Sequence, residues 1–286
     1  MPTKLNDLSG KEWLPRTRSV FVDGVENPNQ LLSWENVSAS FSVMSTATAR
    51  PPSKKEHPAT FPESDARRLI KFFTKTGESV LDPFMGAGST AVACVQEQRA
   101  CTGFELYERW ARLARERVRE ADKNGIANVE IRTVDALKGL AELETGSQSF
   151  ILTSPPYWSI LNKKDHKASS ERVANGLETD YGKDSKDLAQ IEHYGAFLAE
   201  LGTHFKQWQR VLQDKAYAAA IVSDFRHGSR YYPFHAHVGE QMEMAGLMMQ
   251  GLIVIVQDSK RLYPYGFPSS YVPNICNQFV VVGRKL

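Results

Sequence analysis

The chain has 286 residues, 42% of them hydrophobic and 24% charged, which is the composition of an ordinary soluble globular protein. The net charge of +2 neither requires nor excludes a polyanionic partner, so a nucleic-acid surface would have to come from local clusters of Lys and Arg. Three cysteines without a C-x-x-C pair argue against a disulfide framework or a zinc site and favour a reduced, cytoplasmic protein. No apolar run approaches the ~18 residues that span a bilayer, so we expect no membrane partner.

Regular strand and helix patterns begin only after residue 57. Residues 1–56 carry scattered prolines and two tryptophans without a period, and we expect them to form an irregular arm laid on a core. The first helix begins at Pro62, repeats apolar residues along one face, and ends at Gly77. Further helices are expected at about 89–98, around 110–118, and at about 194–212.

Seven segments have the apolar character of strands. They cover residues 78–82, 100–105, 129–134, 149–153, 216–223, 251–257 and 278–283. Because helices separate most of them, the pattern favours an α/β fold with a doubly wound, mostly parallel sheet. Residues 160–190 are polar and lack a period, so we expect them to form an insertion.

The first predicted strand runs into a glycine-rich turn, Asp82-Pro83-Phe84-Met85-Gly86-Ala87-Gly88-Ser89-Thr90-Ala91. Glycines at a strand-to-helix turn let the backbone approach a ligand closely, and the start of the helix offers free N–H groups. The spacing Gly86-x-Gly88-x-x-Ala91 also fits a dinucleotide fingerprint. At this point an NAD site and a tight turn without any ligand both stay open.

Two carboxylates follow at the next strand ends. Glu105 ends the second predicted strand, where an acidic side chain can accept hydrogen bonds from both hydroxyls of a ribose. Asp135 follows the third strand, in a position to meet an adenine amino group. Each alone would be read as a solvated loop residue or a helix cap. In strand order behind the glycine loop, they favour a nucleoside pocket.

A rigid polar and aromatic turn, Thr153-Ser154-Pro155-Pro156-Tyr157-Trp158, follows the fourth predicted strand. The two prolines fix the backbone and remove two donors, so the free groups of this turn are acceptors beside flat aromatic faces. Such a turn suits an exocyclic amino group on a nucleobase. The alternative is a Pro-Pro turn that merely ends a strand.

Several of these motifs resemble those of S-adenosylmethionine-dependent DNA amino-methyltransferases. The run Asp82–Gly88 is similar to the cofactor motif of that family, and Ser154-Pro155-Pro156-Tyr157 is similar to its catalytic motif. His57-Pro58-Ala59-Thr60-Phe61-Pro62 resembles the segment that closes over the methionine part of the cofactor. Near the C-terminus, residues 263–268 and 272–275 resemble the tail of the family. The resemblance covers about residues 57–286, which we therefore interpret as one catalytic domain with a Rossmann-like methyltransferase fold.

The resemblance implies the roles of particular residues. Ser154 and the Pro155 carbonyl would accept the amino hydrogens, Pro156 would fix the turn, and Tyr157 would stack on a base flipped out of duplex DNA. The methyl group would pass directly, by positioning and electrostatics. No cysteine lies in a Pro-Cys turn, which argues against thiolate-dependent carbon methylation. The residues expected to bind S-adenosyl-L-methionine are His57, Pro58, Phe61, Asp82, Pro83, Phe84, Gly86, Gly88, Ser89, Thr90, Glu105, Leu106, Asp135 and Ser154.

Ser154 bears on the choice of base. In the resembled family, S-P-P-Y is associated mostly with cytosine N4 methylation, and N-P-P-Y or D-P-P-Y with adenine N6 methylation. We therefore expect cytosine, with adenine as the alternative. Methylation of RNA or of a protein amide, an inactive module that binds DNA or cofactor, and a nicotinamide oxidoreductase are the other readings. The expected partners are duplex DNA and a restriction endonuclease counterpart, and the protein is expected to be a monomer or a homodimer.

Candidate DNA contacts lie in two basic clusters. Lys163, Lys164 and Lys167 belong to the polar insertion, and Arg226 and Arg230 follow the fifth predicted strand. These side chains could neutralise phosphates, and Arg could also read guanine. Because acidic residues lie nearby, a solvated loop of mixed charge is at least as good an interpretation for each cluster. His235 and His237 lack a third ligand, so we expect structural roles for them and no metal site.

Overall fold

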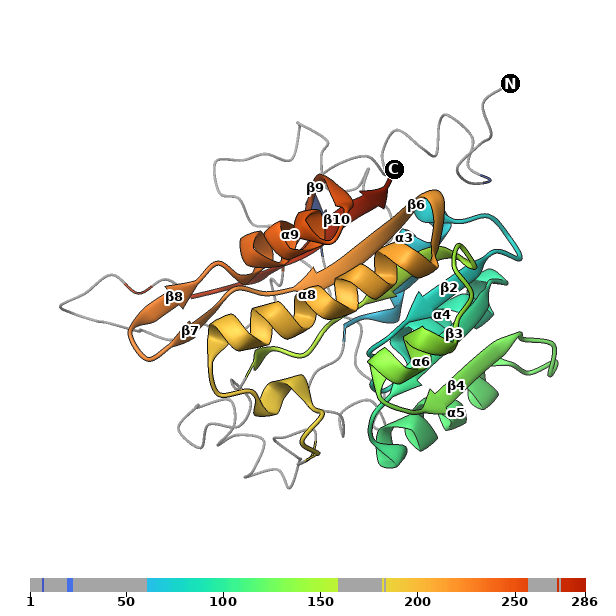
Figure 1. Ribbon diagram of the computed structural model, residues 1–286. Helices are drawn as coiled ribbons and strands as arrows, with labels where there is room; N and C mark the ends of the chain where they lie inside the picture. Colours follow the sequence, from blue (N-terminus) through green and yellow to red (C-terminus); the bar gives the residue numbers. More distant parts are fainter. Residues whose placement is uncertain are drawn as a thin grey trace, which may run out of the picture.

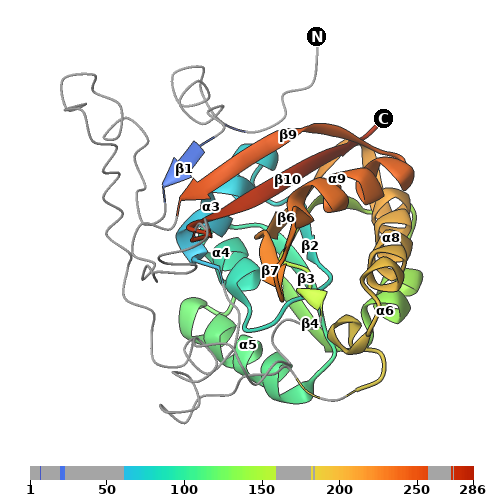
Figure 2. The same ribbon diagram turned by 90° about the vertical axis from the view of Figure 1, so that its left-hand side faces the viewer.

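The computed structural model describes residues 7, 20–22, 61–158, 182, 184–256, 272 and 274–286. In this part of the chain a central sheet is covered by helices on both faces (Figures 1 and 2). Helices α3 (Glu63–Phe73), α4 (Ser89–Glu97) and α5 (Glu108–Ala121) lie on one face. The other face carries α6 (Ala136–Glu142), α8 (Tyr194–Val211) and α9 (Phe234–Met244), with a short 3-10 helix η4 (Leu188–Gln190) before α8.

The strands form one large sheet and one small hairpin within the described residues. The large sheet has the order β1-β9-β10-β6-β5-β2-β3-β4, and β7 pairs with β8 alone. The strands are β1 (Val20–Val22), β2 (Ser79–Asp82), β3 (Ala100–Glu105), β4 (Val129–Thr133), β5 (Gln148–Thr153), β6 (Leu212–Val222), β7 (Phe225–His227), β8 (Arg230–Tyr232), β9 (Leu247–Val256) and β10 (Asn277–Lys285).

The prediction of a doubly wound, mostly parallel sheet of seven strands is confirmed. Of the pairs in the large sheet, only those that β10 makes with β6 and β9 are antiparallel. Strand β1, which lies in the predicted N-terminal arm, adds an eighth strand at the edge by pairing in parallel with β9. Strand β2 lies between β3 and β5, so the strand order reverses beside β2. Ligands of open α/β sheets bind at the carboxyl ends of strands at such a point.

The buried strands pack on both faces, which explains their continuous apolar runs. In β2, Leu81 joins the core under α8 while Val80 joins the core under α3, and both are fully buried. Along α8, the buried face predicted from the apolar spacing is confirmed. Its members Phe197, Leu201, Phe205 and Trp208 have no exposed area. Complete burial of such side chains stabilises the fold by about 1.5–3 kcal/mol each.

Most predicted boundaries agree with the structure to within a few residues, but several elements were not predicted. These are strand β1, the short helices α6 and η4, the helix α9 and the β7–β8 hairpin. Strand β9 also begins at Leu247, before the expected residue 251.

The first helix ends at Phe73, earlier than predicted, because the chain turns extended at Thr74, whose hydroxyl donates to the Ile70 carbonyl at 2.6 Å.

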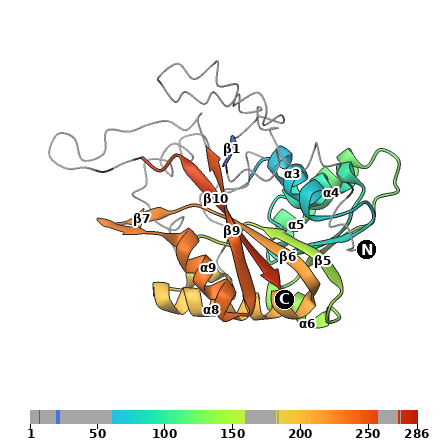
Figure 3. The ribbon, with the colours of Figure 1, turned by 90° about the horizontal axis from the view of Figure 1, so that it is seen from above.

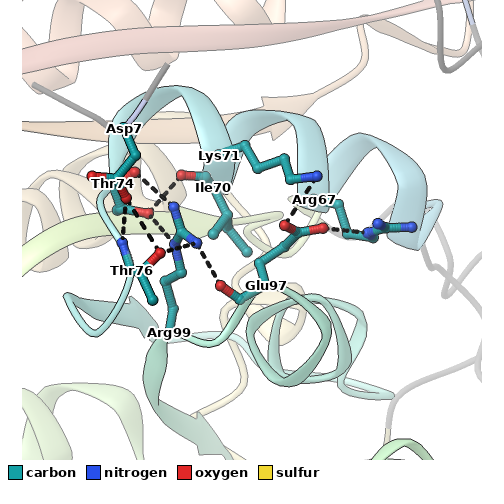
Figure 4. Close-up of polar contacts among 8 residues, drawn as sticks. All are labelled: Asp7, Arg67, Ile70, Lys71, Thr74, Thr76, Glu97 and Arg99. Atoms are coloured by element: carbon teal, nitrogen blue, oxygen red, sulfur yellow. Dashed lines mark hydrogen bonds and ion pairs between the residues drawn. The ribbon is translucent and has the colours of Figure 1, made fainter. Parts of the chain in front are cut away.

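A polar network ties the ends of α3 and α4 together (Figure 4). Arg99 is buried and donates to the Thr74 hydroxyl and carbonyl and to the Glu97 carbonyl. The Glu97 carboxylate accepts from Arg67 on α3 at 2.6 Å. Asp7 accepts from the Thr76 N–H at 2.8 Å, which places one residue of the predicted arm against this corner of the fold.

No helix among the described residues combines the length and the apolar character needed to cross a bilayer.

Candidate functional site

A cavity of about 830 Å³, open to solvent, lies at the carboxyl ends of β2, β3, β4 and β5. This is the edge of the sheet where the strand order reverses. Nine of the residues predicted to bind the cofactor line it, namely Phe61, Pro83, Phe84, Gly86, Ser89, Glu105, Leu106, Asp135 and Ser154.

The glycine-rich loop is held against β3 by its own backbone. The Met85 N–H donates to the Phe104 carbonyl at 2.8 Å, and the Gly86 N–H donates to the Glu105 carboxylate at 2.8 Å. Gly88 has a φ of +82°, and a Cβ there would lie 2.8 Å from the Cβ of Ala114. Glycine is therefore required at this position both for its backbone conformation and for the close approach of α4 to α5.

Two side chains fix the loop from behind. Arg117, buried on α5, donates to the Ala87 carbonyl and pairs with Glu63 in the first turn of α3. The Ser89 hydroxyl donates to the Phe61 carbonyl at 3.0 Å. The loop, the start of α4 and the segment before α3 are thus joined into one wall of the cavity.

Glu105 is the acidic group at the centre of this wall. Its two carboxylate oxygens accept from the N–H groups of Gly86 and Tyr107, at 2.8 and 2.9 Å. Burial raises the pKa of Glu105 to about 7, against the opposing effect of these two hydrogen bonds. Each carboxylate oxygen retains a further lone pair, so the group can accept two hydrogen bonds from a ligand in the cavity.

Asp135 caps helix α6 and also lines the cavity. Its side chain accepts from the Lys138 N–H at 3.1 Å, as an N-cap does. The two interpretations of this residue from the sequence, a helix cap and a ligand-facing carboxylate, are therefore compatible at the same position.

Asp82, Gly88 and Thr90 lie beneath the cavity wall and do not line it. Asp82 is 1% exposed and accepts from three donors: the Phe84 N–H at 3.1 Å, the Thr90 hydroxyl at 2.6 Å and the Thr153 hydroxyl at 2.5 Å. Burial raises the pKa of Asp82 to about 6. This carboxylate joins the glycine loop, α4 and the end of β5, so it positions the site without touching its contents.

The predicted catalytic turn follows directly from Thr153. Ser154 and Pro156 line the cavity, while Pro155 is buried. Tyr157 is not part of the cavity lining; its hydroxyl accepts from Gln278 at 3.5 Å and its ring lies against Phe234. Burial raises the pKa of Tyr157, and hydrogen bonding to Ser154 opposes this shift. Ser154 therefore lies between the cavity and the Tyr157 hydroxyl.

Several residues of the cavity were missed in the sequence. Tyr107 donates its hydroxyl to Asp187 at 2.9 Å, across 80 residues of sequence, and burial raises the pKa of Tyr107. A Cβ on Gly182 would lie 2.1 Å from the Tyr107 ring, so this glycine packs directly on it. The position of Tyr107, two residues after Glu105, was a usable signal. Nothing local pointed to Asp187. The missed lining residues are Met85, Ala87, Phe104, Tyr107, Val134, Ala136, Lys186, Asp187, Leu188 and His204.

His204 is a buried histidine in the cavity wall. Its Nδ1 lies 2.9 Å from the Glu200 carbonyl of its own helix, so Nδ1 carries the hydrogen and Nε2 is an acceptor in the neutral ring. Burial lowers the pKa of His204, which keeps the ring neutral. Its ring lies beside Phe84, with the ring centroids 5.3 Å apart.

The remaining predicted residues fall into two groups. Arg226 and Arg230 lie on the β7–β8 hairpin and do not line the cavity. His57, Pro58, Lys163, Lys164 and Lys167 lie outside the described residues, as does most of the predicted tail.

No group of His, Cys, Asp and Glu within the described residues could hold a metal ion. His235 Nδ1 lies 2.7 Å from Asp224, and His237 Nδ1 lies 2.8 Å from the Tyr194 hydroxyl.

The chain matches a family model described as DNA methylase over residues 12–116. That match includes the glycine-rich loop and Glu105 and ends before the turn at Ser154. M.SmaI, a type II methyltransferase of Serratia marcescens, is 45% identical over 62 residues, which are 22% of this chain and 21% of that protein. M.HpaI of Haemophilus parainfluenzae, also a type II methyltransferase, is 27% identical over 130 residues, 46% of this chain and 40% of that protein. The chain thus spans about a fifth to two fifths of the length of these relatives.

Among solved structures, TrmN from Thermus thermophilus is similar at a TM-score of 0.47 and 17% identity, over 84% of this chain and 55% of that chain.

Proposed function

We propose that the chain is an S-adenosyl-L-methionine-dependent DNA methyltransferase that acts on an exocyclic amino group. The observation that carries the proposal is the hydrogen bonding of Asp82. One buried carboxylate holds both the glycine-rich loop, through the Phe84 N–H, and the start of the Ser154 turn, through Thr153. A ligand site and an amine-accepting turn are thereby built at one place. The DNA methylase match over residues 12–116 supports the same activity from the sequence.

The residues of the cavity fit the proposed cofactor. Phe84, Leu106 and Val134 offer apolar walls to an adenine ring, and Glu105 offers acceptors to ribose hydroxyls. The wall formed by Phe61, Gly86 and Ser89 would hold the methionine part. The Nε2 atom of neutral His204 and the carboxylate of Asp135 add hydrogen-bond acceptors at the same cavity. When bound, the cofactor supplies a methyl group on a positively charged sulfur.

The protein groups at the turn would prepare the nucleophile. An exocyclic amine is a poor nucleophile because its lone pair is delocalised into the ring. Acceptors that draw its hydrogens out of the ring plane restore that lone pair, and we assign this role to the Ser154 hydroxyl and the Pro155 carbonyl. Tyr157 would stack on the base, on the side of Ser154 away from the cofactor cavity. Holding the amine in line with the methyl group supplies the catalysis.

Within this activity we propose cytosine N4 as the acceptor and duplex DNA as the substrate, with the base flipped out of the stack. Ser154 in the turn supports cytosine, and N6 methylation of adenine is the alternative. The type II methyltransferases among the similar proteins support a restriction endonuclease counterpart.

The test is to incubate the protein with methyl-labelled S-adenosyl-L-methionine and mixed-sequence duplex DNA, and to identify the labelled nucleoside after digestion. Label in N4-methylcytosine is expected. Label in N6-methyladenine would reverse the choice of base. The same incubation is repeated with RNA in place of DNA. Label found in RNA or in protein but not in DNA, or no label in DNA, RNA or protein, would overturn the DNA activity. A Tyr157→Ala variant purified in parallel is the control for a contaminating methylase.

A further inference from the structure

The β7–β8 hairpin lies beside the catalytic turn and extends past the carboxyl ends of the central strands (Figures 1 and 3). It follows β6 directly, and its strands pair through Phe225 with Tyr232 and His227 with Arg230. Gly228 and Ser229 form the connection, and Gly228 has a φ of +62°. A glycine with positive φ at the first position suits the tight two-residue turns of β-hairpins.

One face of the hairpin packs on the catalytic turn. The ring of Trp158, the residue after Tyr157, stacks on His227 with the ring centroids 4.5 Å apart and the planes at 28°. Trp158 also contacts Phe225 and Tyr232 on the same face. Trp158 is 5% exposed and its indole N–H donates to the Ile191 carbonyl at 2.8 Å. The position of the hairpin is therefore linked to that of the turn through packed aromatic rings.

The opposite face of the hairpin carries Arg226 and Tyr231, which pair across the strands. The Arg226 guanidinium lies 5.3 Å from the centre of the Tyr231 ring, and that tyrosine is 43% exposed. The Nε of Arg226 is buried and has no hydrogen-bond partner among the described residues. Arg230 at the end of the hairpin is exposed, with its guanidinium over Tyr232. Neither arginine donates a hydrogen bond or forms an ion pair within the part of the chain that the structure describes.

The carboxylate that precedes the hairpin in the chain is buried, so it does not oppose this positive charge from the surface. Asp224, immediately before β7, is 4% exposed. It accepts hydrogen bonds from the Tyr231 hydroxyl at 2.5 Å and from His235 Nδ1 at 2.7 Å. This carboxylate therefore stabilises the start of the hairpin. Residues 225–232 contain no acidic side chain. The hairpin therefore presents two arginines and a tyrosine, and none of its own residues is acidic.

We infer that the β7–β8 hairpin is a duplex DNA contact, with Arg226 and Arg230 on backbone phosphates and the Tyr231 ring against the groove. The inference rests on the proposed function, which supplies the duplex. A two-stranded ribbon has the dimensions to enter a major groove. Phosphate contacts position a protein on the duplex, and here they would do so beside the turn that receives the flipped base. The aromatic packing of Trp158 would transmit that position to Ser154 and Tyr157.

The experiment measures the binding of a fluorescein-labelled duplex of mixed sequence by anisotropy over a series of salt concentrations. Removing one phosphate-binding arginine is expected to lower the slope of log affinity against log salt by about 0.9. The slope of the double variant Arg226→Gln, Arg230→Gln should therefore be smaller by nearly two units, and Tyr231→Ala should weaken binding with little change of slope.

Arg284→Gln is the matched control, because Arg284 also lies over a tyrosine, Tyr217, at 5.1 Å, but this tyrosine is in the middle of β6 and the Arg284 Nε donates to the Lys215 carbonyl, on the side of Tyr217 away from the hairpin. It should bind DNA as the wild type does. Calorimetric titration with S-adenosyl-L-methionine should give wild-type affinity for all variants.

The outcomes separate the two proposals. A wild-type protein that binds no duplex at any salt concentration would overturn the proposed function itself. A wild type that binds, with a double variant of equal affinity and slope, would overturn the hairpin contact alone. The contact is also overturned if the variants lose cofactor affinity in parallel, because the hairpin would then support the fold and not the DNA. Stronger binding of duplex RNA than of DNA would redirect the contact to RNA.

Discussion

Asp82→Asn tests whether the buried carboxylate beneath the site is costly to the fold. Asp82 is enclosed, and no positively charged partner contributes to its pKa; its three partners are one N–H group and two hydroxyls. Asparagine has the same shape, and its carbonyl oxygen can keep the Phe84 N–H. A threonine hydroxyl can rotate to accept from the new amide. The substitution therefore removes the charge while the connections between the loop and β5 are kept.

The magnitude follows from the pKa of Asp82, which burial raises from 3.8 to about 6. Between these two values the unfolded chain releases a proton that the folded protein retains, so the free energy of unfolding falls as the pH rises. At about 1.4 kcal/mol per pKa unit, the loss is complete above the folded pKa and amounts to about 3 kcal/mol. Asparagine does not titrate. The stability difference between variant and wild type should therefore move by up to about 3 kcal/mol in favour of the variant from about pH 4 to about pH 7.

The assay is urea unfolding of both proteins at a series of pH values, with the difference in unfolding free energy plotted against pH. Glu130→Gln is the control of opposite sign, because hydrogen bonding from Arg132 lowers the pKa of Glu130 and its stabilisation is lost as the pH falls. A difference between Asp82→Asn and wild type that stays constant over this range would refute the argument from burial.

Four further predictions concern the cavity, the turn and the glycine-rich loop. Glu105→Gln should weaken S-adenosyl-L-methionine binding by roughly 10- to 100-fold in calorimetry, since charged hydrogen bonds contribute about 1.5–3 kcal/mol; unchanged affinity would remove Glu105 from the site. Wild-type affinity should also fall below about pH 7, where Glu105 takes up a proton and loses an acceptor. Tyr157→Ala should abolish methyl transfer while cofactor affinity stays at the wild-type value, and a parallel loss of both would contradict the assignment. Gly88→Ala should destabilise the fold by about 1–3 kcal/mol in urea unfolding, and more than Gly125→Ala, which has positive φ but open space around its Cβ position.

The fold was predictable where the pattern of apolar residues was long. Strand β3 and helix α8 have one dominant periodicity over their whole length, and their predicted spans agree with the structure to within a residue. The hairpin of β7 and β8 is too short for a period to show in either of its strands. Its signal was the Gly228-Ser229 pair between aromatic-rich runs, which matches the rule for two-residue hairpin loops.

The site was predictable where its residues follow a strand end. Glu105, Asp135 and Ser154 each come just after or at the end of a parallel strand, and the sheet brings such positions to one edge by construction. Asp187 and His204 could not be found this way. They reach the cavity from η4 and the middle of α8, and their positions depend on how those elements pack across the sheet. Asp82 was predicted to bind the cofactor directly. In the structure it is buried beneath the cavity wall, which it supports, and it does not line the cavity.

The structure places the two chemical halves of the proposed site on different supports. The cofactor half is built on β2, β3 and α4, and Arg117 and Glu105 hold its loop from α5 and β3. The base-accepting half depends on Trp158, which is locked between Ile191 and the hairpin. Among the described residues, the halves meet through the pairing of β2 with β5, the Thr153–Asp82 hydrogen bond, and Ser154 and Pro156 in the cavity wall, none of which lies on the hairpin. Changes in the hairpin should therefore alter DNA binding and turnover without changing cofactor affinity. Changes at Arg117 should weaken cofactor binding and leave DNA binding unchanged, because the partners of that side chain among the described residues are the Ala87 carbonyl of the loop and Glu63, and not the turn.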